Sequence, residues 1–202
     1  MAARLASLVV ASAVFAAPVA SACGYHSPQT VALGMLNWSF PKALYVRTAV
    51  WTAENSGMLP PRDLQRPKDM FAFQKASVEL RAFAGRLSAG TAGAGERLSL
   101  AVVLIDAMLW TRLQATPDGY VVHVHADGPQ PDDIVVVTDA KVIRALVDGS
   151  LDAAKAETNG LFRLYRRPER HDRVRGILRN ASIAKQPVNE TRDKAAVRDV
   201  RR

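Results

Sequence analysis

Cysteine is almost absent from this sequence. The chain of 202 residues contains one cysteine, Cys23, so no disulfide can form within it. A secreted domain of this length does not need one if its hydrophobic core is adequate. The region after Cys23 also lacks a cysteine nucleophile, a Gly-x-Ser-x-Gly elbow and a phosphate-binding glycine loop between a strand and a helix. These absences exclude several common catalytic sites, and we expect a protein that is not an enzyme.

The sequence also lacks an apolar run of the length that crosses a bilayer, which is about 20 residues. Residues 5–17 are apolar apart from two serines, Arg4 precedes them, and small residues at positions 20–22 follow Pro18. This order of charged, apolar and small residues is typical of a secretory signal peptide, whereas the competing interpretation is an N-terminal helix of the fold. We expect residues 1–22 to be a signal peptide and the protein to act outside the cytoplasm, in the periplasm or secreted.

Cys23 stands directly after this segment. The stretch from Val19 to Cys23 resembles a bacterial lipobox, in which the cysteine becomes the lipid-bearing first residue, although Ala20 occupies the place where that motif prefers leucine. Ordinary cleavage after Ala22 fits equally well. The sequence leaves both interpretations open: a free exported protein, or one anchored to the membrane through a lipid on Cys23.

Positive charge is concentrated at the C-terminus. Residues 166–202 carry 12 basic and five acidic side chains, which accounts for +7 of the net charge of +8. Segments of mixed charge with few apolar residues are typically solvated, so we expect residues 167–202 to be a basic, disordered tail. A short helix over 170–185 on an anionic membrane surface is the other interpretation of this stretch. Nucleic acid is not expected as a partner of an exported protein.

The first part of the mature chain has helical signals. Residues 23–67 are expected to form a helical N-terminal segment, with Ser27 as a cap and an apolar stripe along 43–55. A longer amphipathic helix is predicted over 69–87, where apolar residues recur every three to four positions after Asp69. We interpret its aromatic residues as core-facing.

Segments rich in valine, isoleucine and threonine then indicate strands. They span residues 98–105, 108–114, 120–126, 134–138 and 161–165, and the first two could also be one long bent strand. Before the last strand, Asp139 caps one short helix that ends at Gly149, and Ser150 or Asp152 caps a second that ends at Gly160. The order predicts an α+β domain over residues 68–166, in which helices cover one face of a mainly antiparallel sheet of about five strands. The 134–138 segment is apolar on both faces and is expected to be central.

One stretch has a more specific pattern. Its positions are Ile134, Val136, Thr138, Asp139, Leu146, Gly149, Leu151, Ala156, Gly160, Phe162 and Leu164. They make an apolar strand ending in Thr-Asp, a helix, a spaced leucine, glycine and leucine, a second short helix and a final strand. In this respect the segment from Asp133 to Tyr165 resembles the C-terminal half of the sterol carrier protein type 2 family.

The resemblance extends over about residues 69–165 and implies a non-catalytic fold that encloses an apolar tunnel for fatty acyl or sterol-like ligands. We therefore expect an exported binding or carrier domain for an apolar or amphipathic, lipid-like small molecule held between the sheet and the helices. The residues expected to line the cavity are Leu104, Met108, Trp110, Val136, Ile143 and Phe162. The alternative is an interaction or scaffold protein of the cell envelope that uses the same fold without a ligand and contacts membranes or partners through its tail.

Few other side chains suggest chemistry. His123 and His125 stand two apart on a predicted strand, so both should project from one face and could donate two imidazoles to a metal ion. The only further ligand nearby is Asp127, in a turn, and we expect no metal and no cofactor. Asp106 lies within an apolar run, where it either faces water in a turn or, if buried, pairs with Arg112.

Overall fold

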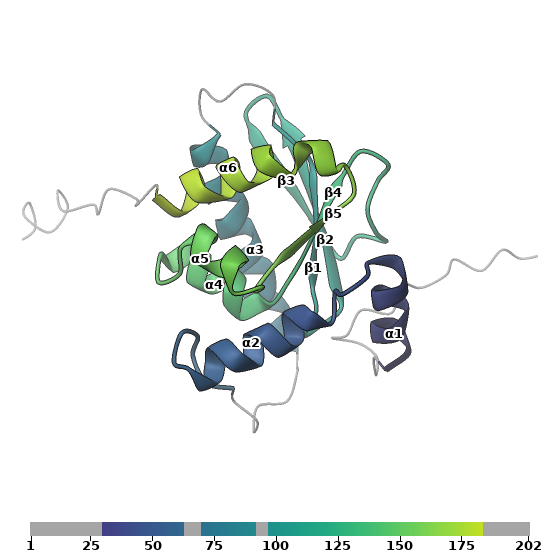
Figure 1. Cartoon of the computed structure of the whole chain (residues 1–202). Coiled ribbons are helices and arrows are strands. Elements are labelled where there is room, and N and C mark those ends of the chain that lie inside the picture. The colour runs from purple at the N-terminus through teal and green to yellow at the C-terminus, as the bar shows by residue number, and fades with distance from the viewer. Residues whose placement is uncertain (1–29, 63–69, 92–96, 184–202) are drawn as a thin grey trace, which may run out of the picture.

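The structure is a computed structural model that describes residues 30–62, 70–91 and 97–183. These residues form an α+β fold around a five-stranded sheet (Figure 1). The strands are β1 (Leu100–Leu104), β2 (Leu109–Thr116), β3 (Gly119–Val124), β4 (Ile134–Thr138) and β5 (Arg163–Tyr165). Their order across the sheet is β3-β2-β1-β4-β5. Only β1 and β4 pair in parallel, so the predicted mainly antiparallel sheet is confirmed.

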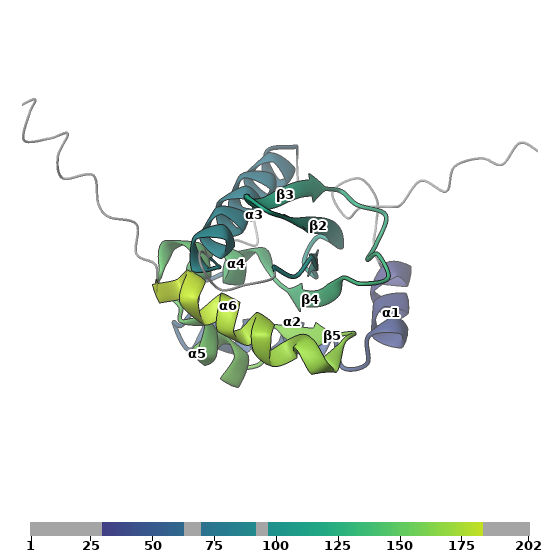
Figure 2. The same cartoon turned by 90° about the horizontal axis from the view of Figure 1, so that it is seen from above.

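Six α-helices and one short 3₁₀ helix are described. They are α1 (Thr30–Ser39), α2 (Tyr45–Asn55), α3 (Met70–Gly90), α4 (Ala140–Asp148), α5 (Ala153–Thr158), η1 (Pro168–Arg170) and α6 (His171–Ile183). Helices α3, α4, α5 and α6 gather on one side of the sheet, and α1 lies on the other (Figure 2). In the described part of the chain, no helix combines the length and the apolar character needed to cross a membrane.

The two parallel strands form the centre of the sheet. All residues of β1 and β4 are buried, and the strands are in register from Leu100 opposite Ile134 to Leu104 opposite Thr138. Strands covered on both faces have continuous apolar sequences because neither set of alternating side chains meets water. The predicted central position of 134–138 is therefore confirmed.

The helix boundaries follow the expected caps. The Asp139 carboxylate accepts a hydrogen bond from the backbone N–H of Lys141 at 2.9 Å, and α4 ends at Gly149 with φ 79°. Asp152, rather than Ser150, caps α5 by accepting from two backbone N–H groups of its first turn. A carboxylate at this position satisfies helix N–H groups that have no partner within the helix.

The structure corrects the predicted start of the basic tail. Residues 168–183 belong to the folded body, since α6 packs against α3 and α5. Its inner face is apolar and buried, and consists of Val174, Ile177, Leu178 and Ala181. Arg173 and Arg179 are exposed, so they dilute the apolar composition of the segment without disturbing its helical spacing. Residues 184–202 lie outside the described part.

The helical N-terminal segment reaches the second face of the sheet. Phe40, which follows α1, packs against Trp110 of β2 and Tyr165 of β5, with ring centroids 5.9 Å and 5.2 Å away. These two side chains lie on the face opposite to Leu104, because Trp110 is in register with Val103 and strand residues alternate between faces. The helical N-terminal segment therefore covers part of the second face.

Candidate binding groove

A groove runs along the free edge of β5, between α5 and α6. It has a volume of about 350 Å³ and is lined by Glu157, Thr158, Gly160, Phe162, Arg163, Leu164, Tyr165 and Arg175. A second hollow of about 130 Å³ shares four of these residues and continues toward Leu178 and Arg179 of α6. Small-molecule sites typically have volumes of ~300–1,000 Å³, so the groove has the size of a small-ligand site.

Local structure holds the walls of this groove in place. Helix α5 is followed by Gly160, whose φ of 68° lies in the left-handed region that glycine adopts without strain. The chain then buries Leu161 and Phe162 before it enters β5. At the far end, the Tyr165 hydroxyl donates a hydrogen bond of 2.9 Å to the carbonyl oxygen of Pro41. The groove is therefore bounded by Phe162, on the chain that leads into β5, and by β5 itself.

Arg175 connects the two helical walls. Its Nε lies 2.6 Å from a Glu157 carboxylate oxygen on α5, and one terminal nitrogen lies 2.8 Å from Asp172 on α6. The hydrogen bonds to Glu157 and Asp172 raise the pKa of the Arg175 guanidinium above its ordinary value. Arg175 is thus charged and already engaged, and it fixes the spacing between α5 and α6.

Arg163 is the least satisfied polar group of the groove. Its Nε is buried and has no hydrogen-bond partner among the described residues. A buried donor without a partner costs about 1–3 kcal/mol, so such groups usually meet an acceptor. Burial raises the pKa of the neighbouring Tyr165, while the positive charge of Arg163 lowers it. An oxygen of a bound carboxylate or phosphate would give this guanidinium the missing partner.

The groove is lined by cations and apolar side chains, with one carboxylate and two hydroxyl groups. Its lining contains no histidine, cysteine or serine. Its one carboxylate, Glu157, is paired with Arg175, and the Thr158 hydroxyl donates to the carbonyl oxygen of Ala154. The lining therefore combines cations with the apolar side chains of Phe162 and Leu164, an arrangement that suits an anion with an apolar body.

The six residues predicted to line a cavity belong to one hydrophobic cluster or pack against it, and they are divided between the two faces of the sheet. Leu104, Val136 and Ile143 are buried in the hydrophobic core, and Trp110 lies on the opposite face of the sheet against Phe40. Met108 occupies the turn between β1 and β2 with a φ of 50°. Phe162 is the one member of the set that lines the groove.

The sequence did not single out Arg163 or Arg175. Arg163 stands between two apolar residues of a predicted strand, which indicates a solvent-facing position, and Arg175 falls in the segment predicted to be a tail. The available signal was the spacing of Val174, Ile177 and Leu178, which predicts a helix with one buried face. Such a helix would have placed Arg175 beside the folded domain.

The two histidines contact different neighbours. His123 Nε2 lies 3.1 Å from Gln114 Oε1, whereas the His125 ring stacks edge-on against Phe73 of α3. The prediction that both project from one face is wrong because His125 has a φ of 66°, which ends the strand alternation. In the part of the chain that the structure describes, no group of three or more potential metal ligands occurs.

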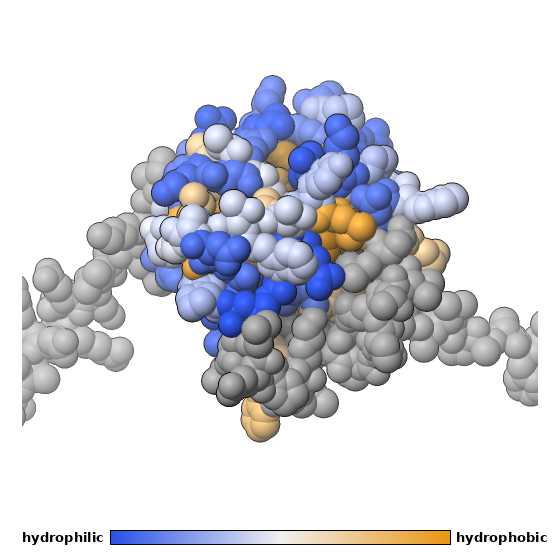
Figure 3. Space-filling view, turned by 60° about the horizontal axis from the view of Figure 1, so that its bottom comes forward, coloured by the Kyte–Doolittle hydropathy of each residue, from blue (hydrophilic) through white to orange (hydrophobic). Residues whose placement is uncertain are grey.

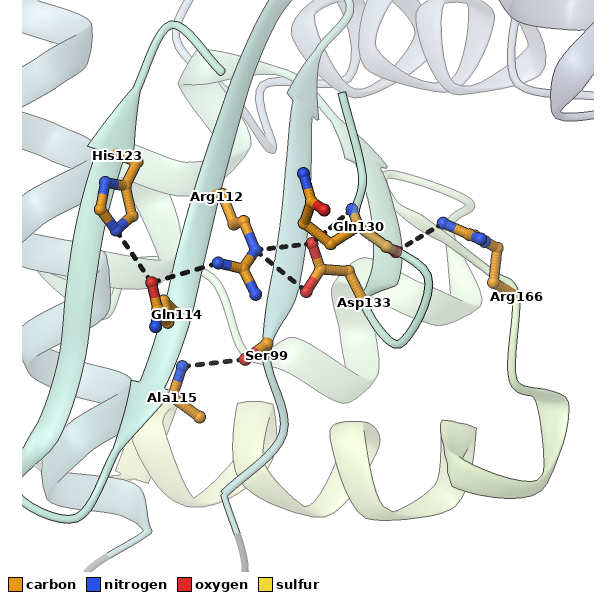
Figure 4. A network of polar contacts seen from close by, with 8 residues as sticks. All are labelled: Ser99, Arg112, Gln114, Ala115, His123, Gln130, Asp133 and Arg166. Carbon is orange, nitrogen blue, oxygen red and sulfur yellow. Dashed lines mark hydrogen bonds and ion pairs between the residues drawn. The ribbon is translucent and has the colours of Figure 1, made fainter. Parts of the chain in front are cut away.

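Arg112 pairs with a different carboxylate from the one considered in the sequence. Its Nε lies 2.9 Å from Asp133, whose side chain is 1% exposed, and Asp133 also accepts from the backbone N–H of Gln130 (Figure 4). Asp106 is at the other end of β1, beyond the reach of this network. The Arg112–Asp133 pair joins β2 to the start of β4 and is structural, since a buried carboxylate needs such partners.

Asp106 instead influences Asp139. The two residues follow β1 and β4, whose carboxyl ends lie together because the strands are parallel. Burial raises the pKa of Asp139 to about 7; the nearby Asp106 carboxylate adds to this rise, and the hydrogen bond from Lys141 opposes it. The Lys141 ammonium lies 2.5 Å from Glu54 and so ties α4 to α2. This cluster lies apart from the groove.

The remaining predicted site, Cys23, is outside the described residues. The chain matches none of the protein-family models, curated proteins or solved structures with which it was compared. The groove is therefore interpreted from its own residues.

Proposed function

We propose that this protein is an exported, non-catalytic binding domain that holds a small amphipathic acid in the groove between α5, β5 and α6. The ligand class is an apolar body with a carboxylate or phosphate head. The observation that carries the proposal is the buried Arg163 Nε without a partner among the described residues, in a groove that Phe162 also lines. The head would pair with Arg163, and the apolar body would lie along Phe162 and Leu164.

The arrangement of elements supports a sterol-carrier-like protein. Helix α3, three strands, β4, two short helices and β5 follow one another as expected from the resemblance, and α6 adds a C-terminal helix beside the groove. The ligand position differs from the initial expectation. Leu104 and Ile143 are each 1% exposed within one continuous hydrophobic cluster, so we place the ligand at the edge of the sheet rather than beneath it.

The test is uptake of a fluorescent fatty acid, compared with a neutral alcohol of the same chain length. We expect Arg163→Gln to weaken fatty-acid binding by roughly 10- to 100-fold, which corresponds to the loss of a charge-assisted hydrogen bond of about 1.5–3 kcal/mol. Binding of the alcohol should change little, because it lacks the anionic head.

Arg81→Gln is the matched control, since Arg81 is an exposed arginine on α3 and does not line the groove. It should bind the fatty acid as the unchanged protein does. Equal binding by all three proteins, or no uptake by any, would contradict the proposal. The second outcome would favour the alternative, an envelope interaction protein without a ligand.

A further inference from the structure

We propose that the outer face of α1 docks onto an anionic membrane surface, with Met35 and Trp38 entering the lipid headgroup region. The ten residues of α1 include no charged side chain. Trp38 is 91% exposed and Met35 is 67% exposed, although both are large and apolar. A tryptophan that is this exposed indicates an interaction surface more strongly than a single exposed leucine does, because its side chain leaves more apolar area in water.

The inner face of the same helix is already occupied. Leu36 is buried, and Phe40 is held between Trp110 and Tyr165 on the sheet. Met35 and Trp38 are three positions apart, so they share one face of the helix and point away from Leu36. The contact at Phe40 thus fixes α1 with Met35 and Trp38 outward.

The flanking residues favour a membrane over a neutral protein surface. Lys42 and Arg47 are the charged residues between Thr30 and Ala53, a stretch that contains no acid. Tyr45, at the start of α2, is 59% exposed. Tryptophan and tyrosine concentrate at the membrane–water interface, and nearby cations attract anionic headgroups. This combination is complementary to an anionic bilayer.

In Figure 3, one patch of apolar colour lies right of centre, while blue and pale residues make up most of the rest of that face. Trp51 of α2 is less available, because the guanidinium groups of Arg47 and Arg62 lie 5.3 Å and 5.2 Å from its ring centre. Trp38 is therefore the aromatic residue expected to enter the membrane.

The position of Cys23 adds a second argument. It precedes Thr30 by seven residues, and an extended chain spans at most about 3.6 Å per residue, or about 25 Å in total. A lipid on Cys23 would hold α1 within that distance of the bilayer. If the chain is cleaved without lipidation, the face must bind alone, and the attachment will be weaker and more sensitive to salt.

The test uses the full chain and a signal specific to Trp38, because residues 5–17 could bind vesicles by themselves. In Trp51→Phe/Trp110→Phe, Trp38 is the only tryptophan left. We expect its fluorescence to shift to the blue, and to be quenched by acyl-brominated lipids, in vesicles of phosphatidylcholine with phosphatidylglycerol. The effect should fall with salt and be smaller without phosphatidylglycerol.

A second comparison does not depend on that double variant folding. Trp38→Ser should weaken salt-sensitive binding to the anionic vesicles several-fold, while Val78→Ser, which alters an exposed residue of α3, should not. Unquenched Trp38 in vesicle-bound protein would overturn the proposal. So would a blue shift that grows with protein concentration in the absence of vesicles, since it would assign this face to a second copy of the chain.

Discussion

Opposing interactions act on the protonation of Asp139, the cap of α4. The hydrogen bond from the Lys141 N–H favours its charged form, whereas burial and the neighbouring Asp106 favour the neutral form. The neutral form gains most, and the pKa rises from an ordinary value near 3.8 to about 7. The folded protein therefore keeps a proton on Asp139 at pH values where the unfolded chain has released it.

Because of this proton, we expect the free energy of unfolding to fall as the pH rises from about 4 to about 7. In that window the folded state binds more protons than the unfolded state, so the free energy of unfolding decreases by up to about 1.4 kcal/mol per pH unit from this group. Below pH 4 both states are protonated at this position and the slope disappears. We expect Asp139→Asn, which can still cap the helix, to remove this part of the slope in urea unfolding across the range.

Asp152→Asn provides the control, because Asp152 caps α5 from an exposed position. It should leave the pH dependence unchanged. A slope in Asp139→Asn as steep as in the unchanged protein would show that other groups cause it.

Single residues were predictable where their role is local. Asp139 and Gly149 predict the start and end of α4, because helix capping depends on residues only a few positions apart. The proximity of Asp106 to Asp139, and of Arg112 to Asp133, depends on which strands pair, and no local pattern records that. The positive φ of His125, which turns its side chain away from the face of His123, could not be predicted from the sequence either.

At the level of elements, the close contact of α3 with α6 depends on glycine. A Cβ added to Gly90 would lie 2.7 Å from the backbone nitrogen of Ala181, whereas a Cβ on Gly85 would meet nothing within 4 Å. We expect Gly90→Ala to lower the free energy of unfolding by about 1–3 kcal/mol, because α6 must shift. Gly85→Ala should raise it by about 0.5–1 kcal/mol through helix propensity. Chemical denaturation of the two variants measures both effects, and equal changes would contradict the contact.

The elements themselves were largely predictable, since five strands and the helices between them follow hydrophobic periodicity and turn residues. A helix over 170–185 was only the second interpretation of this stretch, and its packing on the domain was not predicted, because the basic composition outweighed the spacing of Val174, Ile177 and Leu178. The groove was missed with it, as α6 supplies one wall. A candidate site formed by three elements cannot be located when one of them is assigned to a tail.

At the scale of the whole molecule, Phe40 attaches the N-terminal helices to the sheet. It is 9% exposed, whereas Phe71 on α3 is 75% exposed. We expect Phe40→Ala to reduce the free energy of unfolding by about 3–5 kcal/mol and to shift Trp110 fluorescence to the red, because its ring loses a packing partner. Phe71→Ala should change stability by less than about 0.5 kcal/mol. Similar losses in both variants would contradict this role of Phe40.

The overall arrangement was predictable only in part. The α+β class follows from the order of elements, but the attachment of Phe40 to the second face depends on contacts between residues far apart in sequence. The strand order was not predictable either, because the sequence of an apolar strand does not specify which strand it pairs with.

The parallel pair at the centre also bears on how the chain reaches its native form. Strands β1 to β3 pair with their sequence neighbours, and β5 pairs with β4, so each set can assemble from nearby segments. The two sets join only when β1 meets β4, which follows it in the sequence after β2 and β3, and bringing segments this far apart together is entropically costly. We expect this step to limit the folding rate, and until it occurs two apolar strand edges stay open to other chains.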